Sequence, residues 1–209
     1  MIVAVGSRKG GSGKSTLATS IAVVLANKGD TLLVDSDYQR SSALWASDRG
    51  EAGNEPTITC VEQTSSLRNA LLDLKDRYQY IVVDTAGRDS DSLRLALSVA
   101  DIFLSPLRPS QFDLDTAQGL SESIIEAKQF NPDIRVNVVL NQCSTNVNDK
   151  RPDEAREYLA HYPDLPVLNT NIHYRVAFND ARALGLGVTE YTDPKAKGEI
   201  KAIIEELGL

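Results

Sequence analysis

The chain has 209 residues, of which 42% are hydrophobic and 24% charged, and its formal net charge is −7. This length and balance are typical of one soluble domain spanning residues 1–209, and no run approaches the roughly 18 apolar residues of a membrane-spanning helix. A dedicated nucleic-acid-binding protein is usually basic, so any DNA binding by this acidic chain must come from a local patch and weaken with salt.

Short apolar runs alternate with helical patterns along the chain. Continuous apolar runs bounded by turns are typical of strands buried on both faces. They are expected at 2–5, 31–34, 58–61, 80–83, 102–104, 136–140 and 167–168. Helices are expected at 14–27, 41–46, 65–77, 90–100, 113–129, 152–161, 176–184 and 195–207, and surface loops at 49–56 and 144–150. The alternation predicts an α/β fold with a doubly wound, mostly parallel sheet, helices on both faces and ligands at the carboxyl ends of the strands.

A glycine-rich run from Arg8 to Thr16 joins the first apolar run to the first helical pattern. Backbone N–H groups of such a turn point inward and the helix dipole adds positive potential, which makes a phosphate cradle. Lys14 would reach the β- and γ-phosphates and the Ser15 hydroxyl would hold Mg²⁺, whereas a turn that binds nothing explains this run poorly. The run departs from G-x-x-x-x-G-K-[ST], because Arg8 replaces the first glycine and an extra lysine, Lys9, follows it. The predicted nucleotide-binding residues of this loop are Lys9, Gly10, Gly11, Ser12, Gly13, Lys14, Ser15 and Thr16.

Carboxylates follow two of the predicted strands. Asp35 and Asp37 come directly after the second strand, and Asp84 comes after the fourth. A buried carboxylate needs a cationic partner, and Mg²⁺ on a triphosphate supplies one, usually through water. We therefore expect Ser15, Asp35 and Asp84 around magnesium, with Asp84 as the acid of the Walker B position, although an isolated Asp at a strand end can equally cap a helix. Asp37 is expected to orient the attacking water, and Gly87 to let a backbone N–H approach the γ-phosphate.

The nature of the base is indicated by the sixth predicted strand. GTPases typically carry an N-K-x-D element whose Asp reads guanine, but here the strand ends in Asn141-Gln142-Cys143-Ser144. The missing Asp favours adenine, so ATP and Mg²⁺ are the expected ligands. Asn141 would hydrogen-bond the adenine edge, with a plain turn Asn as the alternative.

The expected compartment is the cytoplasm. Cys60 and Cys143 lie far apart without metal-ligand spacing, so both are expected to be reduced and buried. No basic region precedes the first apolar run, which is expected to be a short strand and not a signal peptide.

Four segments resemble the ParA/MinD ATPases. The run 9–15 resembles their deviant Walker A motif, and 34–39 resembles the D-x-D-P-Q element of the ParA branch, with Tyr38 in place of the proline. The segments 104–113 and 175–181 resemble two further ParA segments in the same order. The length resembles the small ParA class, which lacks an N-terminal DNA-binding extension, and a loop starting at residue 6 is expected to leave no room for one.

This resemblance implies a P-loop fold and a homodimer that closes over two ATP molecules. Lys9 would cross the interface to the partner's ATP, so that Lys9, Lys14 and Asp37 form the catalytic set. A second lysine in a dry interface would stabilise the charge that develops during phosphoryl transfer. The resemblance further implies slow hydrolysis stimulated by an adaptor of ParB-like role. It also implies non-specific DNA binding by the ATP form, hence nucleoid association, and positioning of plasmids, chromosomes or large protein cargo.

Candidate DNA contacts lie in the C-terminal third. The first is Arg175, and the others are Arg182, Lys195, Lys197 and Lys201. Arg175 is the strongest candidate because it lies in a segment that resembles the family, whereas ordinary solvated charge is the alternative for each.

Three other functions fit the sequence less well. A MinD-like membrane ATPase would end in a basic amphipathic helix, but residues 198–209 carry three glutamates against one lysine, which anionic lipid would repel. No membrane partner is therefore expected. An iron–sulfur member of the superfamily would need paired cysteine ligands. A P-loop small-molecule kinase or ligase fits Lys9 and the Asp35–Asp37 pair less well.

Overall fold

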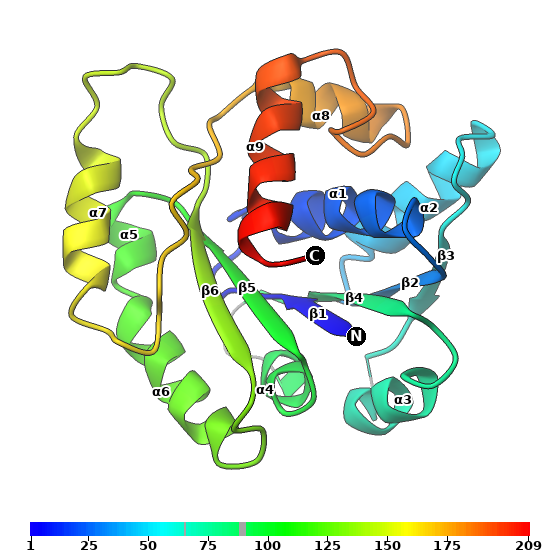
Figure 1. The fold of residues 1–209 in the computed structure, drawn as a ribbon, viewed down its shortest axis with the longest axis horizontal. Coiled ribbons are helices and arrows are strands. Elements are labelled where there is room, and N and C mark those ends of the chain that lie inside the picture. Colours follow the sequence, from blue (N-terminus) through cyan, green and yellow to red (C-terminus); the bar gives the residue numbers. More distant parts are fainter. Residues whose placement is uncertain (65, 88–90) are drawn as a thin grey trace.

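The strands form one parallel sheet. The structure is a computed structural model that describes residues 1–64, 66–87 and 91–209, and within them six strands pair in the order β3-β2-β4-β1-β5-β6 (Figure 1). Every pairing is parallel. The strands are β1 (Ile2–Val5), β2 (Thr31–Ser36), β3 (Thr59–Glu62), β4 (Tyr80–Thr85), β5 (Ile102–Leu107) and β6 (Arg135–Leu140). The predicted doubly wound parallel sheet is confirmed.

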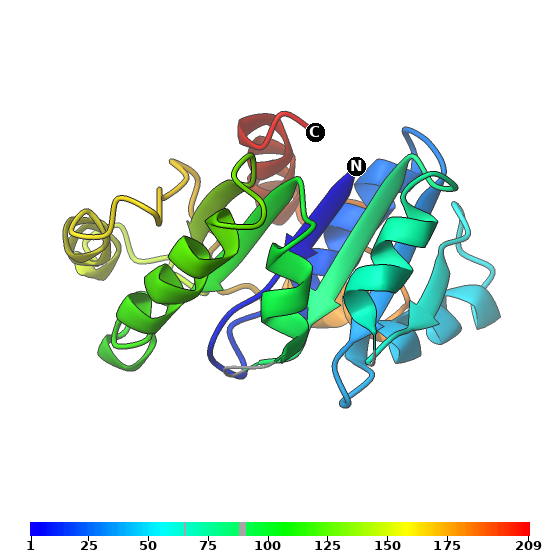
Figure 2. The same cartoon turned by 90° about the horizontal axis from the view of Figure 1, so that it is seen from below.

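Helices cover both faces of this sheet. They are α1 (Lys14–Ala26), α2 (Ser41–Glu51), α3 (Leu67–Leu74), α4 (Asp91–Leu97), α5 (Gln111–Leu114), α6 (Ala117–Lys128), α7 (Arg151–Leu159), α8 (Val176–Ala183) and α9 (Pro194–Glu206). Helices α1, α2, α8 and α9 lie on one face, whereas α3, α4 and α6 lie on the other (Figures 1 and 2). None of the helices in the described ranges is both long and apolar enough to cross a bilayer.

The central strand shows why the sequence needs continuous apolar runs. All four residues of β1 are buried. Ile2 and Ala4 pack into the core beneath α3 and α4, whereas Val3 and Val5 pack into the core beneath α1. Because successive side chains of a strand point to opposite faces, a strand covered on both sides must be apolar at every position.

The strand register brings the acidic residues to one edge. Asp84 of β4 lies level with Val5 of β1 on one side and with Asp35 of β2 on the other. The connection from β1 leads to β2 on one side of the sheet, whereas the connection from the neighbouring β4 leads to β5 on the other side. The carboxyl ends of β1 and β4 therefore form a topological switch point, where α/β folds bind their ligands.

Two predicted elements differ from the structure in this part of the fold. The run 167–168 forms only a single bridge, from Val167 to Val138, and is not a strand. The helix expected at 113–129 is divided into α5 and α6. The buried Asp113 is bound by two cations, and Thr116 Oγ1 donates to the Asp113 carbonyl at 2.7 Å where the chain turns between the two helices. The helix starts predicted at Ser65 and Ser90 lie outside the described residues.

The predicted surface loop at 49–56 is wrong at its start, because α2 continues to Glu51. Arg49 is 1% exposed and donates hydrogen bonds to the carbonyl oxygens of Pro56 and Gly185. It also forms an ion pair with Glu190, with 2.8 Å between Nη1 and Oε2. These contacts bury the Arg49 side chain and tie the last turn of α2 to residues 56, 185 and 190. Of the two free cysteines, Cys143 is buried as predicted, but Cys60 is only partly buried.

Candidate functional site

The glycine-rich loop is held in shape by the end of β6. Gly11 and Gly13 have φ values of +76° and +96°, a region that favours glycine. A Cβ atom on Gly13 would lie 2.3 Å from the side-chain nitrogen of Asn141. That nitrogen donates to the Ser12 carbonyl at 2.6 Å, while the hydroxyls of Ser7 and Ser12 lie 2.7 Å apart. The loop is therefore fixed by contacts that span most of the sequence.

Lys14 is the first residue of α1 and is 7% exposed. Its Nζ donates to the Lys9 carbonyl at 3.2 Å. Burial lowers the pKa of the Lys14 ammonium, and the charges of Asp84 and Asp37 oppose that shift. A cation with so little water around it at a helix N-terminus is suited to a phosphate.

A polar cleft of about 720 Å³ opens in front of this loop. It is lined by Gly10, Gly11, Gly13, Lys14, Ser15, Thr16, Asp37, Gln39, Ser41, Gly87 and Arg182. A Cβ atom on Gly87 would lie 3.1 Å from Lys14 Nζ and 3.3 Å from the Gly10 nitrogen, so glycine permits this close approach. The structure thus brings most of the predicted loop residues together with Asp37 and Gly87.

Asp84 lies behind the cleft and is fully buried. The Ser42 hydroxyl donates to its Oδ2 at 2.7 Å, whereas its Oδ1 is buried and has no hydrogen-bond partner among the described residues. Burial raises the pKa of Asp84 to about 7, although hydrogen bonding from Ser15 and Ser42 acts in the other direction. The unpartnered oxygen fits a water ligand of Mg²⁺, and Ser15 would supply a hydroxyl ligand to the same ion.

Asp35 caps a helix, which was the alternative to a place near magnesium in the sequence-based interpretation. Its Oδ1 accepts from the Asp37 backbone N–H at 3.0 Å, and its Oδ2 accepts from those of Ser42 and Ala43 at 2.9 Å each. Burial raises the pKa of Asp35, while these hydrogen bonds oppose the shift. Asp35 therefore caps α2 and holds Ser42 against Asp84; its place near magnesium stays a prediction.

Asp37 is half-buried and lines the cleft. Its Oδ1 accepts from the Gln39 backbone N–H at 2.9 Å. Burial lowers the pKa of Lys14, and the charge of Asp37, after that of Asp84, opposes this shift. The carboxylate is thus held at the rim of the phosphate site, the position from which a water could be oriented.

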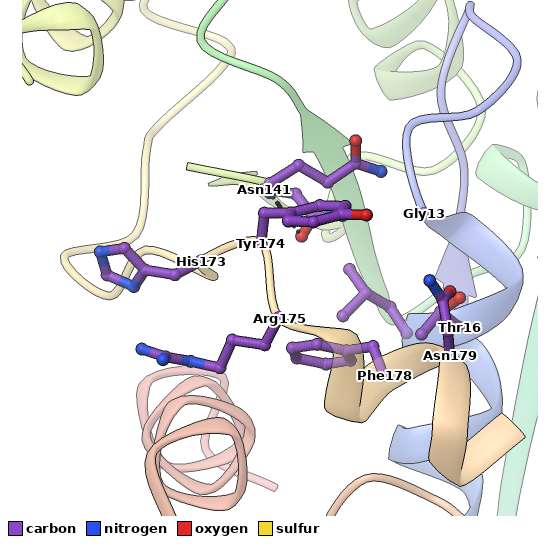
Figure 3. Close-up of a pocket in the computed structure, with 10 residues that line it drawn as sticks. Gly13, Thr16, Asn141, His173, Tyr174, Arg175, Phe178 and Asn179 are labelled. Carbon is purple, nitrogen blue, oxygen red and sulfur yellow. Dashed lines mark hydrogen bonds between the residues drawn. The ribbon is translucent and has the colours of Figure 1, made fainter. Parts of the chain in front are cut away.

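A second, smaller cavity of about 60 Å³ adjoins the cleft and shares Gly13 and Thr16 with it. Figure 3 shows it between the loop, Asn141, and the segment that leads into α8. It is lined by Gly13, Thr16, Leu17, Asn141, Gln142, His173, Tyr174, Arg175, Phe178 and Asn179. Asn141 lines this cavity, but its amide nitrogen is bonded to Ser12 and its oxygen accepts from the Gln142 N–H at 2.8 Å. Its contact with adenine stays a prediction.

Sequence reasoning missed Gln142, Tyr174 and Phe178 as lining residues of this cavity. Gln142 has φ +55° and donates from Nε2 to the Gly11 carbonyl at 3.1 Å. Tyr174 is 60% exposed. The one available signal was their position next to residues already singled out, since Gln142 follows Asn141 and Tyr174 precedes Arg175.

Lys9 points away from its own cleft. Its Nζ lies 3.2 Å from Asp113 Oδ1 and 4.9 Å from the centre of the Phe112 ring. Asp113 is fully buried and also binds Arg108. Burial acts to raise the pKa of Asp113, but hydrogen bonds from Arg108 and Lys9 outweigh it and hold the pKa below its usual value. Lys9 is therefore held at α5 in this form of the protein.

The candidate DNA contacts are placed in different surroundings. Arg175 Nη2 donates to Glu199 Oε1 at 2.9 Å, its side chain is only 17% exposed, and it lines the small cavity. Arg182 lines the phosphate cleft instead. Lys195 and Lys201 are exposed on α9, and Lys197 beside them is partly buried. The three lysines thus share one helix, whereas the two arginines flank the predicted nucleotide site.

Comparison with known proteins gives one family. A model of the CobQ/CobB/MinD/ParA nucleotide-binding domain matches residues 3–188. The maintenance of carboxysome distribution protein A of Halothiobacillus neapolitanus is 29% identical over 210 residues, covering 98% of this chain and 95% of that protein.

Solved structures share the fold over the full length. Apo McdA from Cyanothece matches with a TM-score of 0.84 and 16% identity, covering 100% of this chain and 99% of that one. A variant of the same protein with ATP matches with a TM-score of 0.79 and 14% identity, covering 100% and 96%. Pyrococcus horikoshii MinD with Mg-ADP matches with a TM-score of 0.70 and 18% identity, covering 99% and 95%.

Proposed function

This chain belongs to the CobQ/CobB/MinD/ParA nucleotide-binding family, and on that premise we propose that it is a magnesium-dependent ATPase that positions DNA or a large protein assembly. The observation that carries this proposal is the single cleft that joins Lys14, Asp37 and Gly87 in front of the buried Asp84. A cation, a carboxylate and an open backbone in one cleft support phosphoryl transfer to water as the chemistry of this site. A structure of McdA with ATP and one of MinD with Mg-ADP support the choice of ligands.

The residues would act on ATP as follows. The loop N–H groups and Lys14 hold the β- and γ-phosphates, and Gly87 leaves room for a backbone N–H near the γ-phosphate. Ser15 and, through water, Asp84 hold Mg²⁺, which neutralises phosphate charge when it is bound. Asp37 accepts a hydrogen bond from the attacking water and aligns it. Asn141 fixes the loop from behind and faces the base.

Dimerisation is the step that Lys9 would control. Its ammonium is paired with Asp113, a residue that does not line the cleft. In the ATP form we propose that a second copy docks across the cleft and that each Lys9 leaves Asp113 for the partner's phosphates. Because a triphosphate offers more negative charge than one carboxylate, ATP favours the exchange, and hydrolysis would reverse it.

Cargo positioning would follow from this switch. The ATP dimer is proposed to bind DNA without sequence preference through a basic surface that includes Arg175 and the α9 lysines, and so to associate with the nucleoid. An adaptor of ParB-like role would bind the dimer and stimulate hydrolysis. DNA is one proposed cargo. A large protein assembly is the other, and the carboxysome-distribution relative supports it.

Nucleotide-dependent retention on DNA tests this function. We expect the wild type to be retained on random-sequence DNA with Mg²⁺ and a slowly hydrolysed ATP analogue, and to be released by ADP. Lys14→Ala should lose nucleotide binding and retention together, because it removes the buried cation of the cleft. Lys75→Ala is the matched control, since Lys75 is an exposed lysine at the end of α3. Undiminished nucleotide affinity in Lys14→Ala would refute the site.

A further inference from the structure

Helix α8 runs along both cavities of the nucleotide site. Arg175, Phe178, Asn179 and Arg182 are spaced i, i+3, i+4 and i+7, so they lie along one side of the helix and its N-cap. The first three line the small cavity and Arg182 lines the phosphate cleft. Seven residues of helix rise roughly 10 Å, which is enough to pass from the base of a nucleotide toward its phosphates.

We propose that Arg182 is a polyphosphate-binding residue: its guanidinium contacts phosphate oxygens of the nucleotide bound to its own protomer, and so adds a second cation to Lys14. This inference rests on the proposed ATP site and deepens it. It also moves Arg182 from the DNA surface, where its position in the sequence suggested it, to the nucleotide.

The charge balance of the cleft supports this role. Among the residues that the structure describes, the cations that line the cleft are Lys14 and Arg182. Lys14 Nζ is already bonded to a carbonyl of the loop, and Lys9 of the same protomer is paired with Asp113. Arg182 can therefore add a cation from the same protomer to the charge that Mg²⁺ and Lys14 would supply. A planar guanidinium can bind two phosphate oxygens at once, which an ammonium does less well.

The surroundings of Arg182 support it as well. Two exposed arginines are bound within the chain, since Arg40 pairs with Glu62 and Arg151 pairs with Asp149. The guanidinium of Arg182, by contrast, has no hydrogen bond or ion pair within the described ranges. It lies in the last turn of α8, where the helix dipole favours a cation. The exposed Arg77 is also unpaired in the described part of the chain, but Arg182 lines the cleft and Arg77 does not.

The test is nucleotide affinity in the absence of DNA. Titration calorimetry would measure binding of a slowly hydrolysed thiophosphate analogue of ATP, with Mg²⁺, to the wild type, Arg182→Ala, Arg182→Lys and Arg77→Ala. We expect Arg182→Ala to bind about tenfold more weakly, as for the loss of one charge-assisted hydrogen bond, and Arg182→Lys to recover part of that loss. Arg77→Ala, an exposed arginine after α3 on the opposite face, should bind like the wild type.

Two further readouts separate a phosphate contact from a structural effect. The affinity of Arg182→Ala should depend less steeply on salt, because one ionic contact is missing. The thermal unfolding midpoint of the nucleotide-free variant should equal that of the wild type, since Arg182 is exposed.

Wild-type affinity in Arg182→Ala without DNA would overturn the inference, whatever happens to DNA retention. Running Lys14→Ala in parallel keeps the two proposals apart. If Lys14→Ala loses binding and Arg182→Ala does not, the Arg182 contact is wrong and the ATP site stands. If Lys14→Ala binds normally, the site itself is wrong.

Discussion

The phosphate loop and the two C-terminal helices both carry cations, but they hold them differently. Lys14 is 7% exposed and is placed by the first turn of α1, directly after a glycine turn. On α9, Lys195 and Lys201 are exposed, while Arg175 before α8 is held by Glu199. A cation that is positioned by a backbone turn stays directed at one binding site. A cation that is held by an ion pair can bind another ligand when its side-chain partner is displaced.

The largest effect is expected at the edge of the phosphate site. Asp37→Ala should leave ATP binding intact but lower the turnover number by about 10²–10⁴-fold, because the group that orients the water is lost. ATP-bound dimers should then accumulate, as gel filtration would show. Asp73→Ala, an exposed carboxylate of α3, is the control. Normal turnover in Asp37→Ala would remove this residue from catalysis.

Lys9 combines both situations, because it lies in the glycine-rich loop but its ammonium is held by the side chain of Asp113. Lys9→Ala should bind ATP with nearly unchanged affinity and fail to dimerise, since its ammonium serves the other protomer. Losing one partner of a buried charge pair at an interface costs about 2–5 kcal/mol, which raises the dimer dissociation constant at least tenfold. Sedimentation over a concentration series measures this. An unchanged dissociation constant would contradict the role of Lys9 across the interface.

Asp84 predicts a pH dependence of the nucleotide-free protein. Burial raises its pKa from 3.8 to about 7 in the folded state, so the unfolded chain ionises first as pH rises. The stability due to the protonated carboxyl is thus present below pH 3.8 and is lost as pH rises to about 7, by a few kcal/mol at most. Asp84→Asn has no carboxyl group to ionise there. The free energy of unfolding in urea of this variant, minus that of the wild type, should therefore increase as pH rises from 3.8 to about 7. Parallel curves would show that Asp84 does not titrate there.

The smallest effect is expected on the C-terminal helices. Arg175→Ala should weaken retention of ATP dimers on DNA by roughly tenfold and make it less sensitive to salt, because one phosphate contact per protomer is lost. Dimerisation should persist. Glu199→Gln should have the opposite effect, since it releases Arg175 from its ion pair. Equal DNA affinity in all three proteins would exclude Arg175 as a contact.

The same contrast explains how much of the molecule could be predicted. Gly13, Lys14 and Asp84 were placed correctly because turn geometry and the carboxyl ends of parallel strands are local properties of the sequence. The extension of α2 was missed because Arg49 is buried by Gly185, 136 residues away. Likewise, no local pattern shows that Lys9 is bound by Asp113, or that Arg182 lines the cleft. Contacts across the fold decide these positions.

The central claim is that magnesium and unhydrolysed ATP join two copies of this chain through Lys9. Sedimentation velocity with a slowly hydrolysed ATP analogue tests it most directly. The account predicts a dimer with the analogue and Mg²⁺, a monomer with ADP, and a monomer for Lys9→Ala under both conditions. A wild-type chain that stays monomeric when saturated with the analogue and Mg²⁺ would contradict the account.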